Sequence, residues 1–502
     1  MIKRIIPIVI LLVTIGITSV VFSQSEKSLS PIERSGFNKS TSYSDVVEFL
    51  DVLSKKFTNI HLEVIGNSVQ SRKIHLVHVI LSTESKKIKV LLFAQIHGNE
   101  PSGKEVLLML LNKISQSAET DILSNIDLYI IPLVNPDGNE EGKRANANGE
   151  DLNRDNLLLS QPEVKALHKA YMEIDPDVSL DIHEYSAFRK EFRNAGFVRA
   201  IDEEFGAPTN PNISQSIRNF ALKQVFPFLD STLAQKGVSF SNYYKMESPD
   251  DTVRASSTAI GDGRQSMAIL GSLSFILEGR AGRDMNADLK RRVPRQLIGV
   301  EKFVEFMNLH SEEIKLLVDS EKKRIAESAE SVALKMDYVC DGSKIDMHME
   351  MLDSNEPKVM KLPYASTVKV LESVNRPQAY IIPKKCKDVI EYLNFHDVQY
   401  IKTKFPHKFD VETYTITRKK KAWMENKVFN FPITSIRKET IKTEPGDIIV
   451  PLNQRAGLKM IIALEPGSMW GLSQTVEFNS LFEKGTDYPI LRVPEYKGIE
   501  DE

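Results

Sequence analysis

Two side chains with metal-binding chemistry stand close together in the stretch His97-Gly98-Asn99-Glu100. The apolar run over residues 90–96 precedes them and predicts a buried strand, and helical periodicity follows over residues 104–114. An imidazole and a carboxylate at a strand end suit a divalent cation such as zinc, which keeps an open position when it is catalytic. The stretch therefore predicts two of the ligands of a zinc site. The alternative is a surface loop that contains His and Glu.

A further histidine stands where another predicted strand ends. Residues 177–182 predict a short strand that delivers His183. Histidine is the commonest metal ligand, so His183 is the candidate third ligand, and the alternative is a histidine that is merely hydrogen-bonded. Asp181 lies on the same strand face and either orients this imidazole or is a polar residue at a strand end.

Hydrolysis at a metal also needs a base, and Glu278 is the candidate. It follows the predicted strand over residues 271–277. Partial burial would raise the pKa of its carboxyl group and suit it to proton transfer. The alternative is an ion pair with Arg280.

The loop over residues 144–154 contains the remaining chemistry. Arg144 and Arg154 supply positive charge for a developing oxyanion and a planar donor fork for a substrate carboxylate. Asn153 stands beside the second arginine. The alternative is a polar surface loop with Asn-Gly turns.

Strands and helices alternate over residues 40–315, which predicts an α/β domain with a largely parallel sheet. In such sheets ligands gather at the carboxyl ends of the strands. His97, His183 and Glu278 each follow an apolar strand directly, so we expect them to meet at one edge.

A charged helical stretch over residues 311–332 marks the end of this domain. Residues 333–502 then predict a smaller β-rich region whose role the sequence does not reveal. The basic run Arg418-Lys419-Lys420-Lys421 predicts a solvated hairpin turn, and the alternative is a site for a polyanion.

Composition and the chain start restrict the class of protein. The 502 residues are 41% hydrophobic and 26% charged, and the net charge of -3 gives no reason to expect nucleic acid or acidic lipid as the main partner. Residues 1–24 combine a basic start with an apolar run, which predicts a signal peptide or, alternatively, an N-terminal membrane anchor. Either one exports the remainder. Cys340 and Cys386 form one disulfide or are two buried thiols.

Taken in order, these motifs resemble one family: the zinc metallocarboxypeptidases of the carboxypeptidase A type, peptidase family M14. The resemblance covers roughly residues 40–310. The motifs that carry it are His-x-x-Glu after a strand, Asn135-Pro136-Asp137-Gly138, Asn-x-Asn-Gly-x-x-x-Asn-Arg ending at Arg154, His183 and Glu278. It implies an α/β/α sandwich around a mixed, largely parallel sheet.

The resemblance also implies a role for each residue. His97, Glu100 and His183 would bind one Zn2+ per chain. Glu278 would be the general base and later the general acid, and Arg144 would stabilise the oxyanion. Asn153 and Arg154 would hold the terminal carboxylate of the substrate.

One part departs from the family pattern. Digestive relatives carry a tyrosine some 20 residues before the catalytic glutamate, whereas residues 256–261 here contain none. Tyr243 and Tyr244 could replace it only if the loop differs, and Arg264 is a further candidate for substrate contact.

The sequence thus predicts an exported zinc carboxypeptidase that hydrolyses the last peptide bond of peptides. Two alternatives stay open: a peptidoglycan-stem peptidase or amide hydrolase on the same site, and a peptide-binding relative without turnover. No nucleic acid partner is expected, and no membrane contact beyond the N-terminal segment. The sequence does not reveal the oligomeric state.

Overall fold

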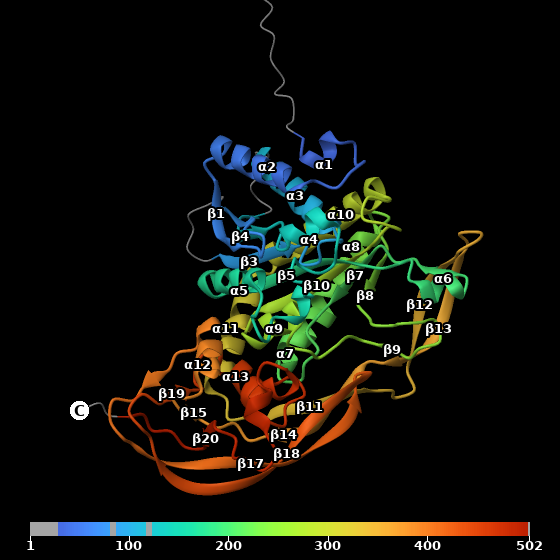
Figure 1. Ribbon diagram of the computed structural model, residues 1–502. Helices are drawn as coiled ribbons and strands as arrows, with labels where there is room; N and C mark the ends of the chain where they lie inside the picture. The colour runs from blue at the N-terminus through green and yellow to red at the C-terminus, as the bar shows by residue number, and fades with distance from the viewer. Residues whose placement is uncertain (1–28, 81–86, 117–122, 500–502) are drawn as a thin grey trace, which may run out of the picture.

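The structure is a computed structural model that describes residues 29–80, 87–116 and 123–499 (Figure 1). The segment 1–24, predicted to be a signal peptide or anchor, lies outside the described residues. Within the described ranges, every helix is too short or too polar to cross a lipid bilayer.

An eight-stranded mixed sheet forms the centre of the larger part of the molecule. Its four middle strands, β4, β3, β5 and β10, run parallel to one another, and antiparallel strands flank them. In order across the sheet the strands are β1 (Ile60–Asn67), β2 (Lys73–Val79), β4 (Ile126–Ile131), β3 (Ile88–Ala94), β5 (Val178–Tyr185), β10 (Leu273–Arg280), β7 (Glu203–Gly206) and β8 (Phe240–Asn242).

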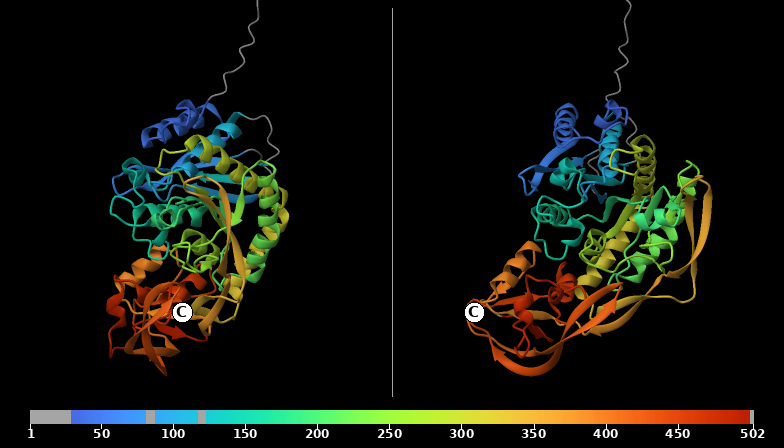
Figure 2. Two further views of the ribbon diagram at one scale, coloured as in Figure 1. Left: turned by 90° about the vertical axis from the view of Figure 1, so that its right-hand side faces the viewer. Right: turned by 45° about the vertical axis from the view of Figure 1, so that its right-hand side comes forward.

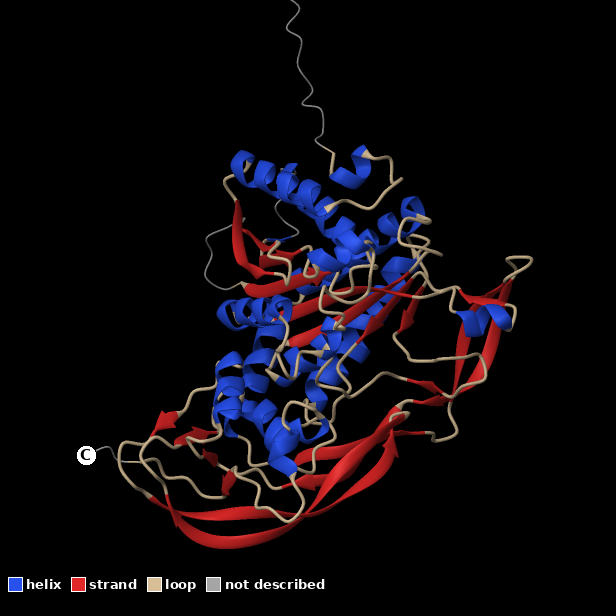
Figure 3. Cartoon of the chain, in the orientation of Figure 1, coloured by secondary structure: helices blue, strands red, loops and turns tan. Residues whose placement is uncertain are grey.

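Helices cover both faces of this sheet (Figures 1 and 3). On one face lie α2 (Tyr43–Lys56), α3 (Ser102–Gln116) and α10 (Leu289–Leu309), and on the other lie α5 (Pro162–Ile174) and α9 (Gly263–Ile269). The predicted α/β/α sandwich around a mixed, largely parallel sheet is therefore confirmed. The remaining helices of this part are α1 (Pro31–Arg34), α4 (Pro136–Glu141), α6 (Lys190–Asn194), α7 (Gln215–Phe220), α8 (Phe226–Ala234) and α11 (Ser311–Glu327).

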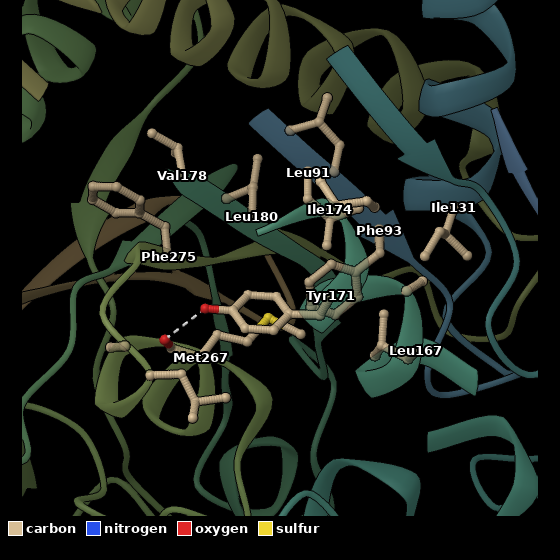
Figure 4. Packing of buried hydrophobic residues seen from close by; sticks show 14 of the residues in the cluster. Leu91, Phe93, Ile131, Leu167, Tyr171, Ile174, Val178, Leu180, Met267 and Phe275 are labelled. Carbon is tan, nitrogen blue, oxygen red and sulfur yellow. Dashed lines mark hydrogen bonds between the residues drawn. The ribbon is translucent and has the colours of Figure 1, made fainter. Parts of the chain in front are cut away.

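Tyr171 shows how the helical layer is fixed beneath the sheet (Figure 4). Its ring comes from α5, is fully buried, and lies among apolar side chains of the core. Its hydroxyl donates to the carbonyl oxygen of Met267 in α9 at 3.0 Å. Because a buried phenol is stable only when its hydroxyl has a partner, this bond joins the two helices in one orientation.

The Asn135-Pro136-Asp137-Gly138 stretch begins a helix instead of making only a turn. Asn135 caps α4, since its side-chain oxygen accepts from Gly138 N at 2.8 Å, and Pro136 occupies the first helical position. Asparagine at the cap and proline at the first position both favour a helix start.

The C-terminal region is built mainly from strands, and Figure 2 shows it as a separate layer below the sheet. A two-stranded sheet contains β11 (Val332–Val339) and β14 (Thr367–Val374). A six-stranded sheet contains β16 (Ile401–Lys402), β19 (Ile448–Pro451), β15 (Ala379–Ile382), β20 (Leu491–Val493), β17 (Lys408–Met424) and β18 (Lys427–Lys442). Its helices are α12 (Lys387–Phe395) and α13 (Gly457–Leu464).

Strand pairing crosses the predicted boundary between the two regions. The projecting hairpin of β12 (Lys344–Met351) and β13 (Pro357–Ala365) pairs with β6 (Phe197–Arg199) and β9 (Val253–Arg254). Because these pairs join strands of both regions, they do not test the domain limits 40–315 and 333–502, which stay a prediction.

The basic run over residues 418–421 is not a turn, so that prediction is wrong. It lies inside the long strand β17, with exposed side chains, and the turn follows at Glu425 and Asn426. Both turn residues have positive φ, 45° and 59°, which is the backbone twist that tight hairpins require.

The two cysteines are free thiols, which excludes the predicted disulfide. Neither is buried as the alternative required, because Cys340 is exposed and Cys386 is only partly covered.

Candidate metal centre and substrate cavity

The candidate site lies at the carboxyl ends of the parallel strands. His97 follows β3 after a short turn, whereas His183 and Glu278 lie inside β5 and β10 near their ends. His183 and Glu278 are register partners in the parallel pair β5–β10. The hydrogen-bonded sheet thus fixes the spacing between these two residues, although 95 positions separate the neighbouring partners Ser179 and Ser274 along the chain.

Three predicted metal ligands converge in a buried cluster. One ligand atom from each of His97, Glu100 and His183 lies within 4.8 Å of the others. The two Nδ1 atoms are 3.0 Å apart, and the Glu100 carboxylate is 2.9 Å from His97 Nδ1 and 3.0 Å from His183 Nδ1. Burial alone would raise the pKa of Glu100, but the two histidines hold it well below its usual range.

The other nitrogen of each imidazole faces its own carboxylate. His97 Nε2 is 3.0 Å from Asp151 Oδ1, and His183 Nε2 is 2.9 Å from Asp181 Oδ1. A proton on each Nε2 leaves both Nδ1 lone pairs directed at one point, which is the tautomer that a metal ligand needs. The donor set of two imidazoles and one carboxylate fits zinc.

Of the two outer carboxylates, sequence reasoning considered Asp181 and missed Asp151. Asp151 stands in a polar loop, where an acidic residue carries no distinguishing signal, and it also accepts from Asn153 N at 3.0 Å. The His97 partner therefore appears only in the folded chain.

Gly98 allows the turn after β3 to approach α4. A Cβ atom at this position would lie 2.0 Å from the carbonyl carbon of Gly138, a distance that excludes any side chain. The close approach also lets Gly98 N donate to Arg144 O at 3.3 Å. His97 and the loop that begins at Arg144 are thereby held together.

Glu278 lines the cavity beside the cluster and forms no ion pair among the residues that the structure describes. The alternative ion pair with Arg280 does not form, because Arg280 pairs with Glu350 at 2.7 Å. Burial raises the pKa of Glu278 to about 7, although nearby His183 opposes the shift. A carboxyl group with that pKa can take up and release a proton near neutrality.

Arg144 bridges two carboxylates of the site. Its Nη1 donates to Glu100 Oε1 and its Nε donates to Asp151 Oδ2, each at 3.1 Å. Burial opposes its charge, but Glu100 and Asp151 raise the pKa of the guanidinium. The side chain is 46% exposed, so one edge of it stays open to the cavity.

Asn153 and Arg154 line the same cavity, and Asn153 Nδ2 lies 3.4 Å from His183 Nε2. Asn153 Oδ1 accepts from Gly263 N at 2.8 Å, which ties the loop to the start of α9. Arg154 Nη1 donates to the carbonyl oxygen of Asn153 at 2.6 Å. Within the described part of the chain, no carboxylate forms an ion pair with Arg154.

One open cavity of about 680 Å³ is lined by six of these groups: His97, Glu100, Arg144, Asn153, Arg154 and Glu278. His183 and Asp181 are buried behind them and do not line it. Tyr243 and Tyr244 both line it, but Tyr244 is only 3% exposed and its hydroxyl accepts from Arg199 Nε at 3.1 Å. Because the Tyr244 hydroxyl is already bonded, Tyr243 is the better candidate to replace the tyrosine that digestive relatives carry. Arg264 is fully buried beneath Tyr243 and does not line the cavity, so direct substrate contact by Arg264 finds no support here.

Two segments beside the cavity are held by the C-terminal region: residues 153–158, and residues 256–266, which form a loop and the first turn of α9. Lys459 Nζ donates to Asn156 O at 2.8 Å and to Ser266 Oγ at 2.9 Å, and His396 Nε2 lies 2.8 Å from Leu157 O. At the tip of the β17–β18 hairpin, Glu425 accepts from the backbone N of Thr258 at 3.1 Å. Sequence reasoning assigned none of these three anchors.

Comparison with known proteins gives one matching family model, described as zinc carboxypeptidase, over residues 46–189. Carboxypeptidase 2 of Trichophyton rubrum is 24% identical over 452 residues, which cover 88% of this chain and 80% of that protein. Carboxypeptidase SOL1 of Arabidopsis thaliana is 40% identical over 103 residues, 18% of this chain and 21% of that protein.

Among solved structures, the carboxypeptidase A of Helicoverpa armigera matches with a TM-score of 0.44 and 18% identity. The match covers 55% of this chain and 75% of that one. A metallo-carboxypeptidase from Burkholderia cenocepacia matches with a TM-score of 0.42 and 17% identity, over 55% of this chain and 71% of that one.

Proposed function

We propose that this metallocarboxypeptidase, whose residues 46–189 match the zinc carboxypeptidase family model, removes the last residue of peptides with a free carboxyl terminus. The observation that carries the proposal is the meeting of a buried His-Glu-His donor set, a carboxylate at the end of β10 and an unpaired arginine in one cavity.

In this proposal His97 Nδ1, His183 Nδ1 and one Glu100 oxygen hold a single zinc ion. Asp151 and Asp181 keep the imidazoles in the ligating tautomer, as the Nε2 distances of 3.0 and 2.9 Å support. The chemistry that zinc supplies at such a donor set is polarisation of the scissile carbonyl and a lowered pKa of the attacking water.

Glu278 moves the protons. Its carboxylate removes one from the attacking water and then gives one to the nitrogen of the leaving amino acid. A pKa near 7 supports both transfers, because neither direction is then strongly uphill at neutral pH. Arg144 directs its guanidinium at the carbonyl oxygen and stabilises the negative charge that develops there.

Arg154 and Asn153 determine that the enzyme cuts at the end of a chain. The arginine fork pairs with the terminal carboxylate of the substrate, and the Asn153 amide adds a hydrogen bond. That Arg154 has no acidic partner among the described residues supports this role, because a bound carboxylate would provide one.

The proposed compartment is outside the cytoplasm. The support is the basic and apolar N-terminal stretch over residues 1–24, which has the pattern of an export signal.

The function is tested with purified protein and matched peptides that end in a free carboxylate or in an amide. We expect release of the last residue from the free peptides only, loss of activity with a chelator, and recovery with added zinc. Glu100→Ala should lose the metal in elemental analysis. Equal cleavage of free and amidated peptides would instead identify an endopeptidase or amide hydrolase.

A further inference from the structure

Lys245 adds a further cation to the cavity that contains Arg154. Its backbone is fixed by a two-way bridge with Arg254, at 2.8 and 3.0 Å, so its position does not depend on the side chain. Among residues 29–80, 87–116 and 123–499, no carboxylate lies within ion-pair distance of its ammonium group. The side chain is half-buried, so water hydrates its charge only in part.

The nearest acidic residue of this part of the cavity, Asp262, is already neutralised. Its Oδ2 lies 3.4 Å from Arg264 Nη2, and its Oδ1 accepts from Gln265 N at the start of α9. Burial would raise the pKa of Asp262, but Arg264, Lys245 and Arg154 lower it. Three cations thus surround one carboxylate.

The buried residue beneath this part of the cavity, Arg264, is itself a cation and does not offset the positive charge. Arg264 is fully buried, and its Nε and Nη1 atoms have no hydrogen-bond partner within the described part of the protein. A substrate's terminal carboxylate would neutralise Arg154 and leave Lys245 unpaired. The cavity therefore has the charge to accept two carboxylates from one substrate residue.

From this arrangement we infer that the enzyme prefers peptides whose last residue has an acidic side chain, Glu or Asp, and that Lys245 binds that side chain. The inference rests on the proposed carboxypeptidase function. An ammonium group suits this task because it is a point charge on a flexible stem, which can reach side chains of two lengths. Burial lowers the pKa of Lys245 to about 8, and the charge of Arg154 adds to the shift, so a bound carboxylate would relieve both.

The test uses the zinc-loaded full chain and four peptides that differ only in a last residue of Glu, Gln, Lys or Phe. We expect kcat/KM for Glu to exceed that for the isosteric Gln by about 10-fold or more, since a charged hydrogen bond is gained. Lys245→Met should bring the Glu/Gln ratio close to one with little change for Gln. Lys245→Arg should keep the preference, and Lys245→Glu should shift it to Lys.

Two results would overturn the inference: a wild-type preference for Lys, or an unchanged Glu/Gln ratio in Lys245→Met. If that unchanged ratio comes with an equal loss for all four peptides, Lys245 binds the main-chain carboxylate instead. Calorimetric binding of the Glu and Gln peptides to Glu278→Gln gives the same ratio without turnover. A failure of hydrolysis is thereby separated from a failure of selectivity.

Discussion

The two sides of the cavity are held by different parts of the chain. On the strand side, His183 and Glu278 lie near the ends of β5 and β10, and His97 and Glu100 lie in the connection that follows β3 in the same sheet. On the loop side, residues 153–158 and 256–266 form no strand, and residues from the C-terminal region anchor them.

The strand side thus holds the residues proposed for the chemistry, and the loop side holds the residues proposed to bind the substrate. A sheet ladder fixes its strand ends through many hydrogen bonds, so no single contact decides where His183 or Glu278 lies. A loop has no such ladder, and each buried polar anchor carries a large share of its order. Changes on the strand side should therefore lower turnover, whereas changes to the loop anchors should weaken substrate binding and stability.

The largest effect is expected from Glu278→Gln, which removes the strand-side carboxylate that we propose as general base and general acid. Turnover should fall by at least about 100-fold, because general acid and base catalysis contributes that much or more. Zinc content should stay normal, since Glu278 is outside the donor set. Glu247→Gln is the matched control, a carboxylate of the same cavity that is 60% exposed. A fully active, zinc-loaded Gln variant would remove Glu278 from the mechanism.

Arg144→Ala tests the residue that links the two sides. Loss of one preorganised donor to an oxyanion raises the barrier by about 3 kcal/mol, so kcat should fall by roughly 100-fold. KM should change little and zinc should remain bound. The variant contradicts the assignment if kcat is normal, or if its only defect is lost metal.

Glu425→Gln tests the hairpin tip that holds the loop side. The carboxylate accepts from Thr258 N and Ser257 Oγ, and an amide supplies one acceptor fewer. We expect unfolding free energy to fall by about 1 to 3 kcal/mol and KM to rise several-fold, while kcat stays close to wild type. Lys438→Met, at a side chain of the same hairpin that is 82% exposed, should change neither quantity. A fall in kcat with unchanged KM would contradict the assignment of substrate binding to the loop side.

The smallest effect is expected from Lys459→Met, and it depends on pH. Burial lowers the pKa of Lys459 to about 7, below the value of an unfolded lysine, although Asp155 opposes this. Between about pH 7 and 10 the unfolded chain therefore binds more protons, so wild-type stability should rise with pH, by at most about 1.4 kcal/mol per unit.

The comparison is made by denaturant unfolding at pH 7 and pH 9. Buried His168 and His396 have pKa values well below the usual range, so both stay neutral throughout this window. Lys459→Met should show a smaller rise, because Lys245, with its pKa lowered to about 8, still contributes. Lys323→Met, at a lysine that is 72% exposed, should keep the full rise. Parallel curves for wild type and Lys459→Met would show that Lys459 does not titrate in this window.

The sequence by itself determined the α/β/α fold class, the family and the candidate residues of the strand side. Each of those residues follows an apolar strand, and parallel strands bring their carboxyl ends to one edge whatever the loops do. Local pattern failed where a residue's role depends on its partner. The basic run in β17 has the composition of a turn, yet Asn426 and its neighbour Glu425 make the turn.

Only the tertiary structure decided which side chains are paired and which are not. Asp151 orients His97, and the anchors of the loop side lie between 167 and 303 positions from the residues they hold. Lys245 is marked out by folding, which places it in the cavity with no carboxylate of the described residues within ion-pair distance. Such pairing depends on distances between distant parts of the chain, and no short sequence pattern encodes those distances.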